Sequence, residues 1–435
     1  MAASPAFLPQ FARLAIVNIL SNLMVPLAGL IDVSFLGHLA EIRHLAGVAL
    51  ATVIFNYIYW TFGFLRMSTT GMTAQAVGRG DSEAVLLIGL RNVLLALGIG
   101  LLILLLQVPL RSLGFALLSA APEVKAAGQD YYNALIWGAP ANLIGFVLIG
   151  WFLGRAESGK VLILSIISSG SNVLLDYVFI KQWGWGSAGA GWATAISQYL
   201  LFLLGMGMVW QIVSWQQLQS LIPKLYDPPA LRSALTLNRE IMIRTFALVT
   251  TFSVFTNLSS TLGTVVLSVN TILLQVVTFA AYFIDGLAFA TESFAGLFHG
   301  RGSTQQLSRL VYLSGAASLS LGLLFAGGLL LLPNLFGLLT DHDAILDRLP
   351  AYLPWLLPVL SFGSIAYMLD GYFLGLTQGR ILRQSTLIAA GVGFAPVAIV
   401  AWQVESSHLL WLALSVFMAA RMLTLGRQVP KTLQG

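Results

Sequence analysis

Several ionisable side chains lie inside long apolar runs of the sequence, and these residues are the best placed to do chemistry. The set comprises one basic residue, Arg66, and five acidic residues: Asp32, Asp176, Asp285, Glu292 and Asp370. A charge inside an apolar membrane segment is costly and usually functional. A carboxylate there can bind and release a proton or a small cation, so we expect ion-coupled chemistry.

Asp32 has the strongest case among these residues. It lies six residues after Pro26 in PLAGLIDVSFLGHL, residues 26–39. Proline has no N–H to donate, so a helix can bend there. An acid just beyond a bend can couple its proton occupancy to helix shape. We predict Pro26 as a hinge and Asp32 as a protonation site; the alternative is a carboxylate hydrogen-bonded in place for packing.

A second polar group has the spacing of one helix face. Asn172 and Asp176 are four residues apart in SNVLLDYVF, and Thr194 follows in GAGWATAIS. An amide, a carboxylate and a hydroxyl suit a proton relay or a small hard cation such as Na⁺. The alternative is a polar patch that holds neighbouring helices together.

The remaining candidates carry weaker signals. Asp285 and Glu292 are seven residues apart, which places them on one helix face. Arg66 can pair with one of them, although a structural pair or a snorkelling side chain is favoured. Asp370 stays a candidate without an assigned role.

Motifs of enzymatic chemistry are missing. Residues 154–160 fit G-x₄-G-K of a phosphate loop, but Val161 replaces the required Ser or Thr, and an apolar helix precedes the motif where a strand is needed. The sequence contains no G-x-S-x-G or H-E-x-x-H motif and no cysteine, and its five histidines do not cluster. We therefore expect neither an enzyme nor an ATP-binding protein, and no cofactor.

The composition predicts that the apolar runs holding the charged candidates are membrane-spanning helices. The chain has 435 residues, of which 57% are hydrophobic and 9% charged, against about 25% charged in soluble domains. Spanning a bilayer takes roughly 20 apolar residues, and no run shows the period-2 alternation of a β-barrel. Twelve runs are long enough: about 10–36, 44–69, 86–108, 126–153, 160–180, 188–213, 240–262, 265–298, 307–332, 348–375, 382–402 and 406–426.

An internal repeat divides these helices into two sets of six. Gly78-Arg79-Gly80 matches Gly300-Arg301-Gly302 at an offset of 222, and GWFLGRAESGK (150–160) matches GYFLGLTQGR (371–380) at 221. We predict an all-α membrane protein with two pseudo-symmetric lobes, 1–214 and 240–435, joined by a polar cytoplasmic linker, 215–239. A cavity between two such lobes is the usual place for an alternating-access site.

The distribution of basic residues predicts the orientation. Sixteen Lys and Arg residues, Arg244 and Arg421 among them, fall at the termini and even-numbered breaks, and five fall at the odd-numbered breaks. This bias places both termini in the cytoplasm. No basic cluster on a soluble face indicates nucleic-acid binding, and the first apolar stretch is too long for a cleavable signal peptide.

Several stretches resemble the multidrug and toxic compound extrusion (MATE) family from about residue 10 to 425. They are LSNLMVPLAGLIDVSFLGHL, FLRMSTTGMTAQAVGRG, SNVLLDYVF followed by GAGWATAISQY, and AYFIDGLAFATESFAGLFHGRG. FLRMSTTG, DGLAFATE and LDGYFLG are most similar to its DNA-damage-inducible F branch. The resemblance implies two lobes of six helices around a V-shaped central cavity.

The resemblance also implies a mechanism. It implies antiport of H⁺ or Na⁺ against small organic compounds, with protonation at Asp32 and a cation site at Asp32, Asn172, Asp176 and Thr194. It implies no resident metal, since Na⁺ would be the coupling ion. We expect a monomer among the lipids of a bacterial inner membrane that exports amphipathic, often cationic compounds.

Other functions stay open at this point. A flippase for a lipid or lipid-linked precursor can use the same two-lobed cavity, although a cavity rich in basic residues would favour it and Arg66 is the one basic residue among the candidates. An ion channel needs a filter-like loop, and none is visible. Neither the cargo nor the choice between H⁺ and Na⁺ can be predicted from the residues.

Overall fold

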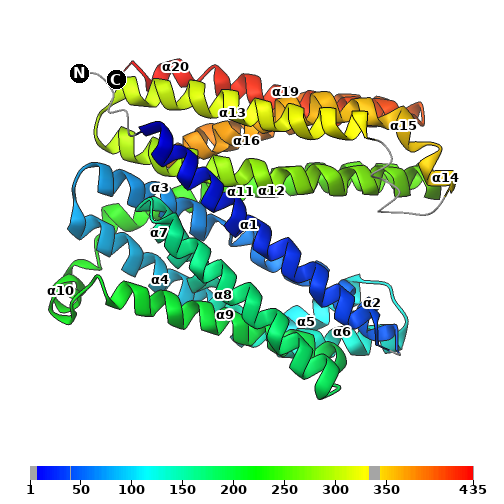
Figure 1. Cartoon of the computed structure of the whole chain (residues 1–435), viewed down its shortest axis with the longest axis horizontal. Coiled ribbons are helices and arrows are strands. Elements are labelled where there is room, and N and C mark those ends of the chain that lie inside the picture. The colour runs from blue at the N-terminus through cyan, green and yellow to red at the C-terminus, as the bar shows by residue number, and fades with distance from the viewer. Residues whose placement is uncertain (1–6, 40, 333–342, 435) are drawn as a thin grey trace. The chain divides into compact units, whose positions relative to one another are not determined.

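The computed structural model describes residues 7–39, 41–332 and 343–434, and the elements in these parts are helices (Figure 1). Twelve segments of the described chain are long and apolar enough to cross a membrane, which confirms the predicted number of spans. The segments are Phe7–Gly37, Arg43–Gly78, Ser82–Leu105, Pro122–Gly154, Ser158–Gln182, Gly186–Trp210, Pro228–Thr261, Thr264–Gly300, Thr304–Leu331, Leu349–Gly375, Gly379–Gln403 and Ser407–Thr432.

Several spans consist of more than one helical element. As far as Lys224, the helical elements of the chain are α1 (Phe7–Gly37), α2 (Arg43–Thr61), α3 (Phe64–Gly78), α4 (Ser82–Leu105), α5 (Gln107–Leu117), α6 (Pro122–Leu135), η1 (Ile136–Gly138), α7 (Ala139–Gly154), α8 (Ser158–Asp176), η2 (Tyr177–Gln182), α9 (Gly186–Trp210), α10 (Trp215–Leu221) and η3 (Ile222–Lys224). From Pro228 onward they are α11 (Pro228–Thr261), α12 (Thr264–Gly300), α13 (Thr304–Leu331), α14 (Asp343–Leu346), α15 (Leu349–Tyr352), η5 (Leu353–Trp355), α16 (Leu356–Gly375), α17 (Gly379–Ile388), η6 (Ala389–Phe394), α18 (Ala395–Gln403), α19 (Ser407–Gly426) and α20 (Val429–Thr432).

The chain forms two compact units, which we call the N-unit and the C-unit. The N-unit comprises Leu20–Ala234, and the C-unit comprises Leu235–Gly435 together with the chain up to Ile19. Helix α1 therefore contributes its first turns to the C-unit and the rest, including Asp32, to the N-unit. In the C-unit the ring of Phe7 packs 5.3 Å from the rings of both Phe294 and Phe298. The lobe boundaries 1–214 and 240–435 stay a prediction.

The internal repeat is visible in the backbone. Ala156 and Thr377, at the offset of 221, both end a helix with positive φ (58° and 56°), and Gly80 and Gly302 do so at the offset of 222 (73° and 67°). In each case the next residue donates its N–H five residues back, as Glu157 does to the carbonyl of Phe152 at 2.9 Å. This is the Schellman arrangement that ends helices, so the two halves share local structure as well as sequence.

Close helix packing also follows the repeat. A methyl group at Gly154 would come within 2.6 Å of Thr73 Cβ, and one at Gly375 within 2.9 Å of Ala295 Cβ. Each glycine closes a G-x₃-G motif, GWFLG or GYFLG. Small residues at this spacing let membrane helices approach closely, and they bring α7 against α3 in the N-unit and α16 against α12 in the C-unit.

The segment that fits a phosphate loop forms a helix–turn–helix. Helix α7 ends at Gly154 and α8 begins at Ser158. Between them, the Glu157 carboxylate accepts from Arg155 Nη2 at 2.9 Å and lies 2.8 Å from Lys160 Nζ. Both basic side chains of this turn are thus paired with the Glu157 carboxylate.

The middle of the predicted linker is held by helix α4. Arg91 donates to the carbonyls of Leu225 (3.0 Å) and Lys224 (2.6 Å), and Lys224 Nζ lies 2.7 Å from a Glu83 carboxylate oxygen. The guanidinium of Arg91 thereby satisfies carbonyls at the end of η3 that no helix continues to bond. Within the range 215–239, helix α11 already begins at Pro228.

A polar network links three helices in the C-unit core. The Asn270 amide on α12 donates to Ser259 (2.9 Å) and Ser407 (3.1 Å), and its oxygen accepts from Trp411 Nε1 at 2.8 Å. All four side chains are buried. Because each polar atom has a partner, the network holds α11, α12 and α19 together without leaving a buried donor unsatisfied.

Two arginines that the sequence analysis assigned to cytoplasmic breaks lie inside spans. Arg244 belongs to α11 and Arg421 to α19, and their side chains are 8% and 0% exposed. That assignment is wrong because α11 extends sixteen residues before Arg244 and because both guanidinium groups have a buried partner. The orientation itself stays a prediction.

Candidate functional site

The N-unit holds the predicted polar group on two neighbouring helices. Asn172 and Asp176 lie one turn apart on α8, and their side chains are 6% and 0% exposed. Asn172 Nδ2 donates to Thr194 Oγ1 on α9 at 3.2 Å, and Thr194 donates to the Ala190 carbonyl at 3.0 Å. The Asn172 Oδ1 atom and the Asp176 carboxylate are therefore the oxygens that remain for a proton or a cation.

Asp32 reaches the same place from α1. Its carboxyl group lies within hydrogen-bonding reach of the Asp176 carboxyl group. Among the described residues, Asp32 Oδ1 and both carboxylate oxygens of Asp176 have no hydrogen-bond donor. Two carboxyl groups can share a hydrogen bond when one of them carries a proton, so the contact is complete in a singly protonated pair.

Two further residues border this carboxyl pair. The hydroxyl of Tyr131 on α6 lies within hydrogen-bonding reach of Thr52 on α2 and of Thr194, and it faces the charges of Asp32 and Asp176. Sequence spacing could not identify Thr52 or Tyr131 because each comes from a different helix. Together the residues from α1, α2, α6, α8 and α9 form one polar cluster inside the N-unit.

The charge of this cluster limits its chemistry. Within the described residues, neither Asp32 nor Asp176 has a Lys or Arg partner. Two carboxylates in contact repel each other, and an apolar setting makes an uncompensated charge costly. The pair can therefore exchange a proton or a small cation, and it has no nucleophile–base arrangement for bond breaking.

The backbone of α8 changes at the cluster. Regular α-helix ends at Asp176, and the wider η2 turn (Tyr177–Gln182) is a π-helix that follows at once. Short π-helical turns are frequent at functional sites. Pro26 lies inside the continuous helix α1, six residues before Asp32. Because proline has no backbone N–H, the helix that carries Asp32 to the cluster lacks one backbone hydrogen bond.

The other charged candidates lie elsewhere. Asp285 on α12 faces Tyr282 and Tyr367 in the C-unit, and Glu292 is fully buried on the same helix. Arg66 is half-buried on α3 in the N-unit, and its favoured role as a structural or snorkelling side chain, like the alternative of a pair with Asp285 or Glu292, stays a prediction. Asp370, also in the C-unit, is bound by two arginines.

Twelve candidate spans and a buried polar cluster define an integral membrane protein. The MatE family model matches residues 18–178 and 241–400, and the chain belongs to this family, whose members are transporters. This confirms the resemblance predicted from the sequence and agrees with a protein that is not an enzyme.

Individual relatives agree with this assignment. The chain is 35% identical over 416 residues to DNA damage-inducible protein F of Escherichia coli (strain K12), covering 95% of this chain and 90% of that protein. It is 29% identical over 304 residues to a probable multidrug resistance protein NorM of Rhizobium meliloti (strain 1021), covering 68% of this chain and 63% of that protein.

The fold has close counterparts among solved structures. A MOP superfamily transporter from Pyrococcus furiosus matches with a TM-score of 0.88 at 19% identity, covering 98% of this chain and 96% of that chain. The predicted fold class is thereby confirmed. These comparisons do not favour the alternative of a lipid flippase.

Proposed function

We propose that this transporter is an antiporter that expels amphipathic, often cationic organic compounds in exchange for a proton. The contact between the Asp32 and Asp176 carboxyl groups carries this proposal. A hydrogen bond between two carboxyl oxygens requires a proton, so the pair is a one-proton site when it is closed. Na⁺ is the alternative ion, because Asn172 and Thr194 add an amide and a hydroxyl oxygen.

Helix α1 provides a way to couple ion exchange to movement. It contributes residues to both units, and Pro26 lies seven residues after the point where α1 passes from the C-unit to the N-unit. A bend at Pro26 would change the approach of Asp32 to Asp176. Protonation joins the two carboxyl groups, whereas loss of the proton makes them repel each other, so the ion state favours one of two α1 shapes.

The ion gradient supplies the free energy for export. One charge moving through 100 mV releases about 2.3 kcal/mol, and a gradient of one pH unit adds about 1.4 kcal/mol. Export of multidrug-type cargo is supported by the relative from Rhizobium meliloti, a probable multidrug resistance protein. The cargo itself would bind away from Asp176, which is fully buried.

The remaining features of the proposal concern the setting. We propose a monomer in a bacterial inner membrane, in contact with its lipids and with both termini in the cytoplasm. The charge bias of the breaks supports this orientation.

Reconstitution in liposomes tests the proposal. The purified chain would be placed in vesicles with an imposed pH gradient or an imposed Na⁺ gradient, and accumulation of a panel of amphipathic dyes would be measured. We expect dye transport driven by the pH gradient and unaffected by a Na⁺ gradient alone. Transport that follows the Na⁺ gradient would assign Na⁺, and transport that follows neither gradient would refute antiport.

A further inference from the structure

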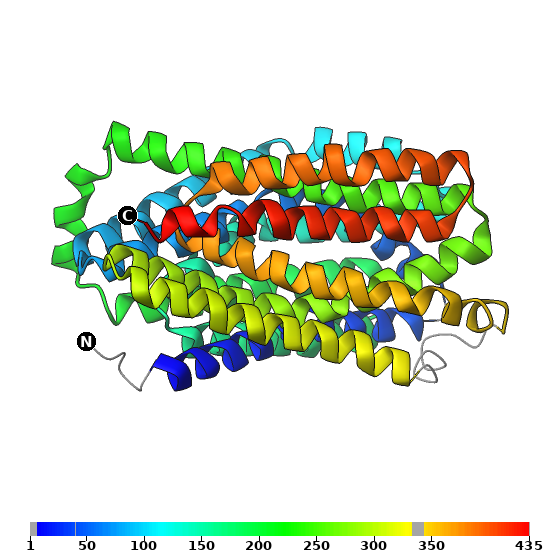
Figure 2. The same cartoon turned by 90° about the horizontal axis from the view of Figure 1, so that it is seen from above.

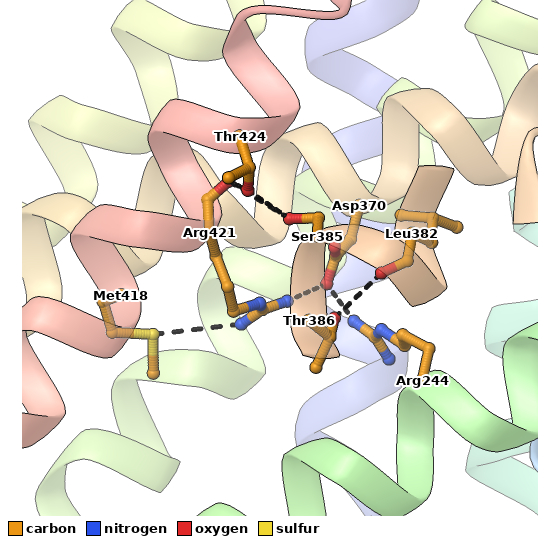
Figure 3. Close-up of polar contacts among 8 residues, drawn as sticks. All are labelled: Arg244, Asp370, Leu382, Ser385, Thr386, Met418, Arg421 and Thr424. Carbon is orange, nitrogen blue, oxygen red and sulfur yellow. Dashed lines mark hydrogen bonds and ion pairs between the residues drawn. The ribbon is translucent and has the colours of Figure 1, made fainter. Parts of the chain in front are cut away.

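A buried ion triad lies in the C-unit, outside the polar cluster of the N-unit. Arg244 on α11 and Arg421 on α19 both donate to Oδ2 of Asp370 on α16 (Figure 3). Figures 1 and 2 both draw α19 alongside α16, and the two helices are in contact. The side chains of Arg244, Asp370 and Arg421 are 8%, 6% and 0% exposed.

The surroundings hold Arg421 in place. Its guanidinium lies 5.3 Å from the ring centroid of Tyr367 and 5.7 Å from that of Phe417, and Nη1 lies 3.8 Å from Met418 Sδ (Figure 3). Cation–π contacts stabilise a desolvated guanidinium. Because the arginine is fully enclosed on α19, it stays beside Asp370 and cannot swing out to solvent.

A charged group next to the triad, Glu240, also has basic partners. One turn before Arg244, Glu240 bonds Arg239 (2.9 Å) and Arg383 (3.0 Å). Asp285 on α12 lies close enough to Tyr367 to interact with it electrostatically, as the triad does. The formal charges of Arg244, Arg421, Asp370 and Asp285 sum to zero, and Glu292 on α12 adds one further buried carboxyl group to the C-unit.

Asp370 of the C-unit is therefore held in the opposite way to the carboxyl pair of the N-unit. In the N-unit, Asp32 and Asp176 contact each other and have no described basic partner. In the C-unit, Asp370 is held by two groups that remain protonated at any physiological pH, since guanidinium does not release its proton in proteins. The guanidinium groups of Arg244 and Arg421 occupy the position beside Asp370 that a mobile cation would need.

From this contrast we infer that Arg244 and Arg421 act as built-in counter-ions of Asp370, so that Asp370 exchanges no cation and each transport cycle moves one cation, at Asp32–Asp176. The inference rests on the proposed antiport and specifies its stoichiometry. It makes Arg244 and Arg421 positioning residues: they hold the Asp370 side chain between them and join α11, α16 and α19.

The main test uses a charge-balanced double variant, Arg244→Gln with Asp370→Asn. It removes one positive and one negative charge, and both amides retain hydrogen-bonding capacity toward Arg421. Infrared spectroscopy of the purified full chain would follow the C=O band of protonated carboxyl groups through a pH titration. The cation-to-dye ratio would be measured in proteoliposomes from the gradients at which net flux stops, and Asp176→Asn serves as the matched control.

We expect a ratio of one for the wild type and the double variant, with the titrating carboxyl band unchanged in the double variant and lost in Asp176→Asn. A ratio of two in the wild type, or loss of the titrating band in the double variant, would overturn the inference. A band that persists in Asp176→Asn would contradict the proposed function itself, and with it the assignment of the cation.

A milder variant keeps the test decisive if the double variant does not fold. Arg244→Gln leaves the Asp370–Arg421 ion pair in place. We expect no shift of the midpoint of the carboxyl band, because the titrating group lies in the other unit. A midpoint that moves to higher pH would show that Asp370 titrates, and would overturn the inference.

Discussion

Substitution of Asp176 by Asn separates folding from ion exchange in the N-unit. Asp176 is fully buried, and its oxygens have no donor partner among the described residues other than a proton shared with Asp32. The Asn amide has nearly the same shape and donates its own N–H to the Asp32 carboxylate. The variant thus keeps the contact between α1 and α8, and the amide N–H takes the place of the shared proton, so the contact no longer requires one.

The expected magnitudes follow from this geometry. A hydrogen bond to a charged group stabilises by about 1.5–3 kcal/mol, so we expect the variant to be at least as stable as the wild type. One proton per molecule and a gradient of one pH unit correspond to about 1.4 kcal/mol, or about tenfold accumulation of dye. Without an exchangeable proton, the accumulation ratio of Asp176→Asn should fall to about one.

The assay is dye accumulation in proteoliposomes with a one-unit pH gradient and a clamped membrane potential. Thermal unfolding in detergent provides the control for folding. A variant that still accumulates dye about tenfold would refute the assignment of Asp176 to the coupling site. A variant that unfolds well below the wild-type temperature would refute the hydrogen bond assumed between the two residues.

Three further substitutions test the structure outside the site. Burial raises the pKa of Glu157, but hydrogen bonds from Lys160 and the neighbouring arginine outweigh it and lower the pKa below its usual 4.5. Glu157→Gln should therefore lose less than about 1 kcal/mol of stability at neutral pH, and this difference should disappear as the pH falls below 4.5 through the lowered pKa, measured by thermal unfolding across pH. Asn270→Ala leaves Trp411 Nε1 without its acceptor and should cost about 2–4 kcal/mol of stability by denaturant titration. Gly154→Leu overfills the α3–α7 contact and should cost about 1–3 kcal/mol or more, measured by thermal unfolding.

Each of these three predictions would be contradicted by a specific outcome. A Glu157→Gln difference that grows in acid would mean that the carboxylate is not stabilised by its basic neighbours. Wild-type stability in Asn270→Ala would show that the Asn270 network does not hold the C-unit helices together. Normal unfolding of Gly154→Leu would show that α3 and α7 are not in close contact.

The spans and the repeat were predictable from sequence because the membrane imposes both. Each helix must satisfy its backbone internally and cover about 30 Å of hydrocarbon, which leaves long apolar runs bounded by turn residues. The repeat can be recognised in the sequence because its matching turns place Gly80 and Gly302 at positive φ, a conformation that glycine adopts most easily. Composition and local geometry therefore sufficed for the twelve spans and the repeat.

The candidate site was predictable in part. Asn172 and Asp176 lie on one helix face, a relation that spacing alone reveals. The contact between Asp32 and Asp176 joins helices 144 residues apart in sequence, and only the family resemblance grouped them beforehand. Tyr131 and Thr52 entered the cluster through helix packing, which no local pattern encodes.

The arginines of the C-unit show why the rest could not be predicted. Arg244 and Arg421 lie near the ends of apolar runs, where a positive charge normally marks the cytoplasmic interface. Their burial depends on Asp370, a partner on a third helix. Whether a charged residue can be buried among helices depends on such partners. Counting charges along the sequence does not show which residues on other helices will pair.

Proton release on addition of cargo tests the central claim most directly. Proteoliposomes that hold a trapped pH indicator would be mixed with a dye that the wild type transports, and the indicator would report proton movement. Wild-type protein should move protons in step with dye, and Asp32→Asn should move none while folding normally. Undiminished proton movement in Asp32→Asn would contradict the account.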